Sequence, residues 1–285
     1  MSTTPPAHPT PARDRAGAPD AAAETWHYGL IARWWAEVNT PDYAELDYLR
    51  AAITRHGEPA LDLGCGTGRL LVPLLADGLD VDGIDISGDM VALARDAGEA
   101  AGIDMDGRLG VQAFDALDRG RAYGYVFSIG SFAIGSSPRR DATALRRIHD
   151  HLRPGGAVAL SYEVLPPEGL ARLTDPARVF PEPWSEDAAR ATLRDGDVLE
   201  LRGRTTGYDP VTRCQGLAVR ATLMRDGGAI AEEEGALACT YYEPDVLRGM
   251  LETAGFVEIS VEGPYTGRPP RPDDDTVVMT ARRPV

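Results

Sequence analysis

The stretch that most constrains the fold of this chain is residues 61–68, a short apolar run with an acidic residue followed by three alternate glycines. Residues 69–75, directly after it, have the apolar spacing of a helix. The pattern predicts a strand, a tight turn and a helix. Glycines can adopt positive φ and let the backbone lie against a ligand, to which a helix N-terminus offers unpaired N–H groups. We therefore predict a turn that binds a nucleotide.

The spacing of the glycines indicates which ligand the turn would hold. A dinucleotide fingerprint, G-x-G-x-x-G, requires glycine where Arg69 stands, so the spacing disfavours a nicotinamide-dependent oxidoreductase. The stretch resembles instead the first motif of the class I S-adenosylmethionine (SAM)-dependent methyltransferases, D/E-x-G-x-G-x-G. The four defined positions of that motif are occupied by Asp62, Gly64, Gly66 and Gly68.

Composition and charge favour a small-molecule substrate. The 285 residues contain 29 Lys and Arg against 44 Asp and Glu, a net charge of −15. Nucleic acids and anionic membranes are bound mainly by basic side chains, so we expect neither as a partner. The three cysteines form no C-x-x-C pair, so we expect no disulfide framework and no metal site, and a cytoplasmic location. We find neither a signal-peptide pattern nor a run of about 18 apolar residues. The oligomeric state stays open.

Strand-like and helical segments alternate along most of the chain. This alternation predicts a doubly wound α/β fold with a seven-stranded, mostly parallel sheet. Pro73 lies inside the first expected helix, where it should remove a hydrogen bond and bend the axis. The expected strands are residues 61–63, 79–85, 109–113, 123–129, 157–162, 257–261 and 276–281, and the expected helices are residues 69–75, 88–98, 139–152 and 244–254.

Three segments depart from this alternation. Residues 1–23 are rich in Pro, Ala and Thr without an apolar period, which predicts a disordered tail before a domain spanning residues 24–285. Residues 24–50 contain three of the four tryptophans and suit an aromatic lid over a cofactor. The segment of about residues 165–243 predicts an inserted antiparallel sheet. Its strand-like runs are residues 197–205, 213–224 and 229–241.

Two further segments extend the resemblance to small-molecule class I methyltransferases. Residues 83–90 resemble the G-x-D-x-S-x-x-M segment of that family, and residues 152–156 resemble its L-x-P-G-G turn. The resemblance implies a Rossmann-like methyltransferase fold, SAM as the cofactor and a small-molecule substrate. The aromatic N-terminal segment and the antiparallel insertion are reminiscent of enzymes that N-methylate amino sugars or glycine.

The resemblance also implies roles for individual residues. Gly64 and Gly66 would lie against the methionine part of the cofactor. Asp85 would accept the ribose hydroxyls, and its distance of about twenty residues from the first glycine is typical of a ribose-binding acid. The other implied cofactor contacts are Asp62, Cys65, Ile86, Met90, Asp115, Ala116 and Ser128, and the implied substrate contacts are Tyr28 and Ser131.

Methyl transfer is an in-line displacement, so the protein contributes mainly by holding an unprotonated acceptor near attack distance. Two residues are candidate catalytic bases. His27 lies in the aromatic segment, and Glu163 follows the fifth strand at the carboxyl edge, where ligands bind in open α/β sheets. Glu163 would also suit a substrate ammonium. We expect an enzyme that methylates an N or O atom of a small metabolite; the alternative is a catalytically inactive SAM-binding regulatory protein.

Overall fold

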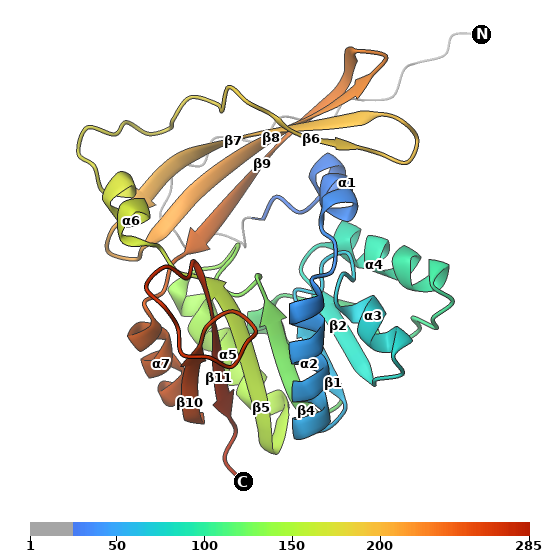
Figure 1. Ribbon diagram of the computed structural model, residues 1–285, viewed down its shortest axis with the longest axis vertical. Coiled ribbons are helices and arrows are strands. Elements are labelled where there is room, and N and C mark those ends of the chain that lie inside the picture. The colour runs from blue at the N-terminus through green and yellow to red at the C-terminus, as the bar shows by residue number, and fades with distance from the viewer. Residues whose placement is uncertain (1–24) are drawn as a thin grey trace.

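The computed structural model describes residues 25–285, and the predicted disordered tail, residues 1–23, lies outside this range. Two sheets organise the described part of the chain (Figure 1). The strands of the larger sheet are β1 (Ala60–Leu63), β2 (Val81–Asp85), β3 (Leu109–Val111), β4 (Tyr123–Ile129), β5 (Leu152–Glu163), β10 (Val257–Glu262) and β11 (Thr276–Arg282). They lie in the order β10-β11-β5-β4-β1-β2-β3.

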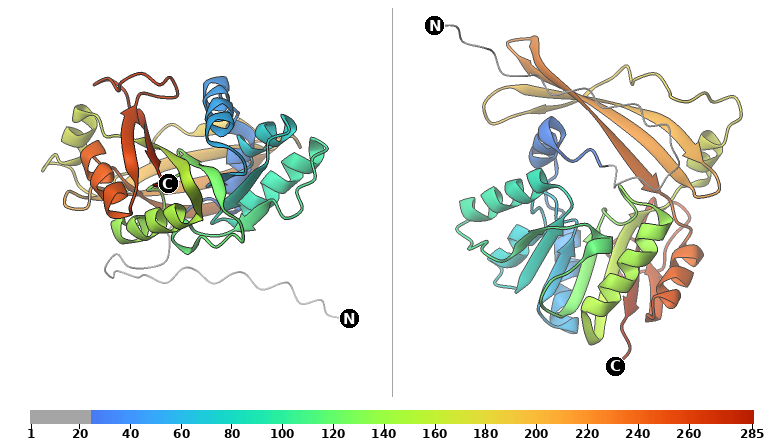
Figure 2. Two further views of the ribbon diagram at one scale, coloured as in Figure 1. Left: turned by 90° about the horizontal axis from the view of Figure 1, so that it is seen from below. Right: turned by 180° about the vertical axis from the view of Figure 1, so that it is seen from behind.

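Most neighbouring strands of the larger sheet are parallel. β1 pairs in parallel with β2 and β4, β2 with β3, and β4 with β5, whereas β11 pairs antiparallel with both β5 and β10. Helices cover both faces (Figure 2). The covering helices include α2 (Tyr43–His56) and α3 (Leu71–Ala76) on one face and α5 (Pro138–His151) and α7 (Pro244–Thr253) on the other. The predicted doubly wound, mostly parallel α/β fold is confirmed.

The central strands are apolar on both sides, as this layering requires. Val126 of β4 belongs to the core cluster that contains Leu145 of α5, while its neighbours Tyr125 and Phe127 belong to the cluster that contains Leu49 of α2. Successive side chains of a strand point to opposite faces. A strand that is buried on both faces therefore has a nearly continuous apolar sequence, and all seven residues of β4 are buried.

The second sheet is antiparallel and has four strands. These are β6 (Ala189–Thr192), β7 (Val198–Asp209), β8 (Cys214–Arg225) and β9 (Gly228–Thr240), paired in the order β6-β7-β8-β9. The sheet lies beyond the carboxyl ends of the parallel strands (Figure 1). This confirms the inserted antiparallel sheet. The sequence does not predict the short strand β6 or the helix α6 (Pro167–Leu173) that precedes it.

Several element boundaries differ from their predictions. α3 begins at Leu71, two residues later than expected, so Pro73 lies in its first turn. Helical bonds run from Val72 N to Gly68 O at 2.9 Å and from Leu74 N to Leu70 O at 3.2 Å. Pro73 lies between these donors and has no N–H, so it removes one bond of the helical series, as expected. β5 begins at Leu152 and includes the Pro-Gly-Gly segment that was expected to be a turn.

The aromatic N-terminal segment joins the two sheets. α1 (Gly29–Val38) packs against the second sheet and against α4 (Gly88–Ala100), which lies beside β2 and β3. Leu30 and Ile31 are buried in a cluster with side chains of β7 and β8. Trp26, Trp34 and Trp35 pack around that cluster. No helix within residues 25–285 is long and apolar enough to cross a membrane.

Candidate functional site

The glycine turn follows β1, as the sequence predicts. Gly64, Gly66 and Gly68 have φ values of +75°, +54° and +82°, which only glycine adopts without strain. A Cβ added at Gly64 would lie 2.4 Å from Ser131 Oγ, so this glycine permits close packing between the ends of β1 and β4. A Cβ at Gly66 would meet no atom within 4 Å. The open side of the turn is therefore at Gly66.

Asp85 at the end of β2 organises the same turn. Its Oδ2 accepts a hydrogen bond of 3.0 Å from Gly66 N, and its Oδ1 accepts one of 2.8 Å from Ser87 N. Burial raises the pKa of Asp85, and hydrogen bonds from backbone amides oppose that rise. An ionised carboxylate has about four acceptor positions. Two of them are used by these amides, which leaves acceptor capacity for a pair of ligand hydroxyls.

A cavity of about 460 Å³ lies between the carboxyl ends of the parallel strands and the second sheet. This volume is within the range of small-molecule sites. Its floor comes from the glycine turn, the ends of β2, β4 and β5, and the loop after β3. Its other walls come from the N-terminal segment, the loop before α5 and the second sheet. The residues of those walls include Trp26, His27, Trp35, Ile134, Arg140, Leu217, Leu237, Cys239 and Tyr241.

The cavity brings together most of the residues that the sequence singles out. Those on its wall are His27, Gly64, Gly66, Asp85, Ile86, Met90, Asp115, Ser131 and Glu163. The predicted residues outside its wall are Tyr28, Asp62, Cys65, Ala116 and Ser128.

Asp62 and Cys65 are close to the turn, but both side chains are buried. Burial raises the pKa of Asp62 to about 8, Arg69 opposes this rise, and the carboxylates of Asp85 and Glu45 add to it. The Cys65 side chain belongs to the core cluster between the sheet and α2, and burial raises its thiol pKa. A ligand in the cavity would therefore meet neither side chain directly, contrary to the expectation of contacts with the cofactor.

Ser128 is fully buried beneath Ser131, and the two hydroxyls hydrogen-bond at 2.7 Å. Ser131 Oγ in turn donates to Leu63 O at 2.8 Å, which fixes the loop after β4 against the end of β1. Ser128 thus supports the wall without forming it. Tyr28 is 43% exposed and donates to Ile86 O at 3.2 Å, outside the cavity. The Ala116 N–H donates to Ala113 O at 3.0 Å, so it is engaged within its own turn.

Asp115 lies on the wall as a member of an ion pair that the sequence does not predict. Arg140 of α5 donates from Nε and Nη2 to its two carboxylate oxygens at 2.8 and 2.9 Å. These bonds hold the pKa of Asp115 below its usual value and raise that of Arg140. No motif marks Arg140, because it follows Asp115 by 25 residues and meets it only through the packing of α5 beside η1 (Phe114–Ala116).

The two candidate bases face the cavity from different elements. His27 is positioned by hydrogen bonds of its ring to Thr25 and of its carbonyl to Ser87. Burial lowers the pKa of His27 to about 4, so its imidazole is neutral at physiological pH and only weakly basic. Glu163 is the last residue of β5. Burial and the nearby carboxylate of Asp275 raise the pKa of Glu163.

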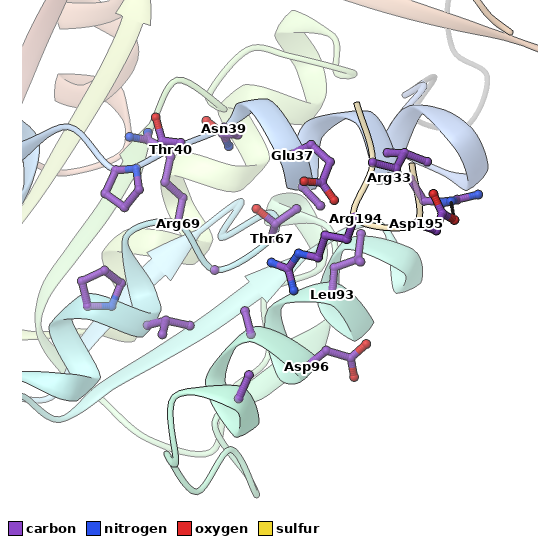
Figure 3. Close-up of a pocket in the computed structure, with 18 residues that line it drawn as sticks. Arg33, Glu37, Asn39, Thr40, Thr67, Arg69, Leu93, Asp96, Arg194 and Asp195 are labelled. Atoms are coloured by element: carbon purple, nitrogen blue, oxygen red, sulfur yellow. Dashed lines mark hydrogen bonds and ion pairs between the residues drawn. The ribbon is translucent and has the colours of Figure 1, made fainter. Parts of the chain in front are cut away.

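A second cavity, of about 660 Å³, lies behind the glycine turn between α1, α3, α4 and the β6–β7 turn (Figure 3). It shares Asn39, Thr67 and Arg69 with the first cavity. Arg69 forms an ion pair with Glu45 of α2. Arg33 of α1 and Asp195 of the β6–β7 turn approach to 3.5 Å, so a polar contact links α1 to the second sheet here.

Comparisons with known proteins place the glycine turn and the strand-end acid within a methyltransferase domain. Residues 60–156 match a family model described as "Methyltransferase domain". Residues 60–156 therefore carry a methyltransferase domain.

Curated relatives match only part of the chain. A ubiquinone biosynthesis O-methyltransferase of Azorhizobium caulinodans is 26% identical over 150 residues, which cover 46% of this chain and 58% of the relative. An enzyme of the same name from Xylella fastidiosa is 36% identical over 72 residues, 25% of this chain and 28% of the relative. The chain thus matches less than two thirds of each relative's length.

Solved structures match nearly the whole chain. A SAM-dependent methyltransferase from Clostridium acetobutylicum superposes with a TM-score of 0.67 at 15% identity, covering 90% of this chain and 98% of that protein. The sugar N-methyltransferase KedS8 from a Streptoalloteichus species gives 0.65 at 16% identity, covering 97% and 99%. At these identities the likeness establishes the fold, including the second sheet, and leaves the substrate to be argued from the site.

Proposed function

We propose that this protein transfers a methyl group from SAM to a nitrogen or oxygen atom of a small molecule. The observation that carries the proposal is one continuous cavity that joins two kinds of wall. One wall has the features of a nucleoside site, and the other, from the second sheet and the loop before α5, offers apolar and ionisable side chains to an acceptor. An acceptor on the second wall would lie beside a cofactor on the first.

The first wall fits SAM. Gly66 presents an open backbone face, and Asp85 has acceptor capacity for two ribose hydroxyls. Ile86 and Met90 line the cavity beside Asp85 and would flank the adenine ring. Asp115, held in place by Arg140, would accept from the adenine amino group. Bound SAM would supply an electrophilic methyl carbon on a sulfonium sulfur.

The residues of the chain would hold the acceptor in place and exclude water from the reacting atoms. The N-terminal segment, with Trp26, His27 and Trp35 on the wall, would act as the lid over the reacting atoms. His27 would accept a hydrogen bond from an acceptor, because burial lowers its pKa and keeps its imidazole neutral. Ser131, at the junction of the two walls, would contact the substrate. Holding the acceptor lone pair close to the methyl carbon accounts for most of the rate that such a site can provide.

Two measurements test this proposal. Calorimetric titration of the full chain with SAM should show saturable binding. Incubation with SAM carrying a deuterated methyl group and a pool of small metabolites should then give S-adenosylhomocysteine and a labelled product, both detected by mass spectrometry. If SAM does not bind, the proposal is wrong. If SAM binds but no S-adenosylhomocysteine forms above the protein-free control, the catalytically inactive regulatory alternative is favoured.

A further inference from the structure

The charges on the cavity wall are compensated unequally. Three carboxylates line the cavity: Asp85, Asp115 and Glu163. Asp85 accepts from two backbone amides, and Asp115 accepts from both arms of Arg140. Among residues 25–285, Glu163 has neither a hydrogen bond nor an ion pair through its side chain, and the charged group that acts on it is a second acid, Asp275. Glu163 is thus the wall carboxylate that lacks a positive partner.

The surroundings of Glu163 suit the body of an organic cation. Cys239 at the end of β9 and Tyr241 just beyond it are close enough for the Glu163 carboxylate to raise the pKa of each. The Tyr241 hydroxyl donates to Gln215 Oε1 at 2.8 Å, and Gln215 Nε2 donates to Thr205 Oγ1 at 3.0 Å. These bonds hold the aromatic ring on the wall of the cavity. Leu217 and Leu237 of the second sheet line it as well.

The register of the sheet sets the distance between Glu163 and the glycine turn. Asp62 pairs with Phe127, and Phe127 pairs with Ala159, so Gly64 is level with Ser161 two strands away. Glu163 is two residues further along β5. With strands about 4.8 Å apart and a rise of about 3.3 Å per residue, the Cα atoms of Gly64 and Glu163 are separated by about 12 Å. A cofactor sulfonium and a small acceptor group can occupy that interval.

We propose that the methyl acceptor is an amine with an apolar body, and that Glu163 recognises its ammonium group beside the ring of Tyr241. This inference rests on the proposed function and names the substrate class for the same site. An ammonium would gain a charge-assisted hydrogen bond and a contact with an aromatic ring. An alcohol could also donate to the carboxylate, but it would bring no positive charge to Glu163 and would gain no cation–π contact with the ring.

Glu163 also provides a route for the proton that an ammonium must lose before it can react. The ammonium gives one proton to the carboxylate of Glu163, which is exposed at the end of β5, and the neighbouring carboxylate of Asp275 favours the protonated form of Glu163. The amine lone pair then forms the new C–N bond while the C–S bond of SAM breaks, and the electron pair of that bond remains on the sulfur of S-adenosylhomocysteine. Glu163 returns its proton to solvent, and the product leaves as a methylated ammonium. The raised pKa of Glu163 is consistent with this role.

Two charge-neutralising variants separate this role from a general effect of lost charge. Glu163→Gln keeps the shape of the side chain and removes its charge. Glu168→Gln removes the same charge from an exposed position on α6, outside the cavity wall, and serves as the matched control. SAM affinity, measured by calorimetry, should be unchanged in both variants, which shows that each variant is folded and that the cofactor wall is intact.

The labelled product from the metabolite pool is isolated, and tandem mass spectrometry assigns the methylated atom. We expect an amine. With that amine as substrate, Glu163→Gln should raise KM at least about tenfold, the scale of one charge-assisted hydrogen bond. It should also move the optimum of kcat/KM to higher pH, where the amine is neutral without help. The groups that face Glu163 and must be considered in this profile are Asp275, Cys239 and Tyr241.

Glu168→Gln should keep the wild-type KM and pH profile. A product labelled on oxygen, carbon or sulfur would overturn the inference while leaving the proposed function intact. An amine product whose KM and pH profile are the same in Glu163→Gln and the wild type would also overturn it. Absence of SAM binding, or of any labelled product, would instead remove the proposed function on which the inference rests.

Discussion

Replacing Gly66 by alanine separates ligand binding from folding at the glycine turn. Gly66 has a φ of +54°, and a Cβ there would meet no protein atom within 4 Å. The same holds for Gly78, which follows α3 with a φ of +82°. Gly78 lies outside the cavity wall, whereas Gly66 is part of it. The two glycines therefore form a matched pair: both have positive φ and room for a methyl group, but only Gly66 lines the cavity.

The cost to folding should be similar in the two variants. A residue with a Cβ at positive φ loses about 1–2 kcal/mol of stability, and no steric clash adds to this at either position. For a protein of this size, that loss lowers Tm by about 2–8 °C. Binding should differ sharply. The new methyl group of Gly66→Ala would project into the space where the backbone meets SAM, and we expect a loss of affinity of at least about tenfold, or about 1.4 kcal/mol.

Thermal unfolding without ligand and calorimetric titration with SAM measure the two effects. Both variants should unfold at similar temperatures below that of the wild type, and Gly78→Ala should bind SAM with wild-type affinity. If Gly66→Ala also binds SAM with wild-type affinity, the open face of Gly66 is not the cofactor site, and the assignment of the turn should be abandoned.

Three further substitutions test other parts of the site. Asp85→Ala should weaken SAM binding by about 1–3 kcal/mol, because it removes the hydroxyl acceptor and leaves two amides unpaired. Arg140→Ala should weaken SAM binding several-fold by releasing Asp115, yet cost less than about 1 kcal/mol of stability, because the ion pair is 24% exposed on each side. Asp62→Asn should remove a pH dependence of stability, measured by urea unfolding. The carboxyl of Asp62 titrates near 3.8 when unfolded and about 8 when folded, so the wild type should lose stability as pH rises through this window, on the order of 3 kcal/mol between about pH 5 and pH 8.

Each of these expectations has an outcome that contradicts it. Unchanged SAM affinity in folded Asp85→Ala would refute its role as an acceptor of hydroxyl groups. A large loss of stability in Arg140→Ala would mean that its pair with Asp115 serves the fold more than the cavity. If the wild type and Asp62→Asn show the same dependence of unfolding free energy on pH, the Asp62 carboxyl does not titrate in the way its burial implies.

The elements that depend on local patterns could be predicted from the sequence. The seven-stranded sheet follows from apolar runs that alternate with helical periods. The glycine turn follows from three glycines that all adopt positive φ. The position of Asp85 follows from the geometry of a strand and a turn, since its contacts lie within two residues or within the adjacent turn.

Side-chain direction at the strand ends could not be predicted from motif alignment alone. Ser128 was expected at the cofactor from the resemblance to the methyltransferase family, and it lies one residue before the end of β4 at Ile129. The pleat sends alternate side chains to opposite sides, however, so Ile129 reaches the cavity wall and Ser128 does not. A motif can locate the end of a strand correctly and still assign the ligand contact to the wrong one of two adjacent residues.

Contacts between distant segments had no local signal at all. Arg140 meets Asp115 only because α5 packs beside η1, and Cys239 and Tyr241 meet Glu163 only because the second sheet lies over the parallel strands. The sequence shows that an antiparallel insertion exists. It does not show which end of that sheet faces the cavity, because this depends on packing between elements that are separated by more than 70 residues.

The N-terminal end of α1 shows how one short segment can couple the two walls of the cavity. Gly29 N donates to Asp89 Oδ2 of α4 at 2.7 Å, and Leu30 N donates to Glu233 Oε2 of β9 at 2.7 Å. The first turn of a helix has unpaired N–H groups and a partial positive charge, so both carboxylates are favourable there. One carboxylate belongs to the methyltransferase domain and the other to the second sheet. The position of α1 therefore fixes how far the second sheet stands from the glycine turn, and Trp35 on the same helix lines the space between them. A displacement of α1 would change cofactor and acceptor contacts together, because both walls are attached to the same helix end.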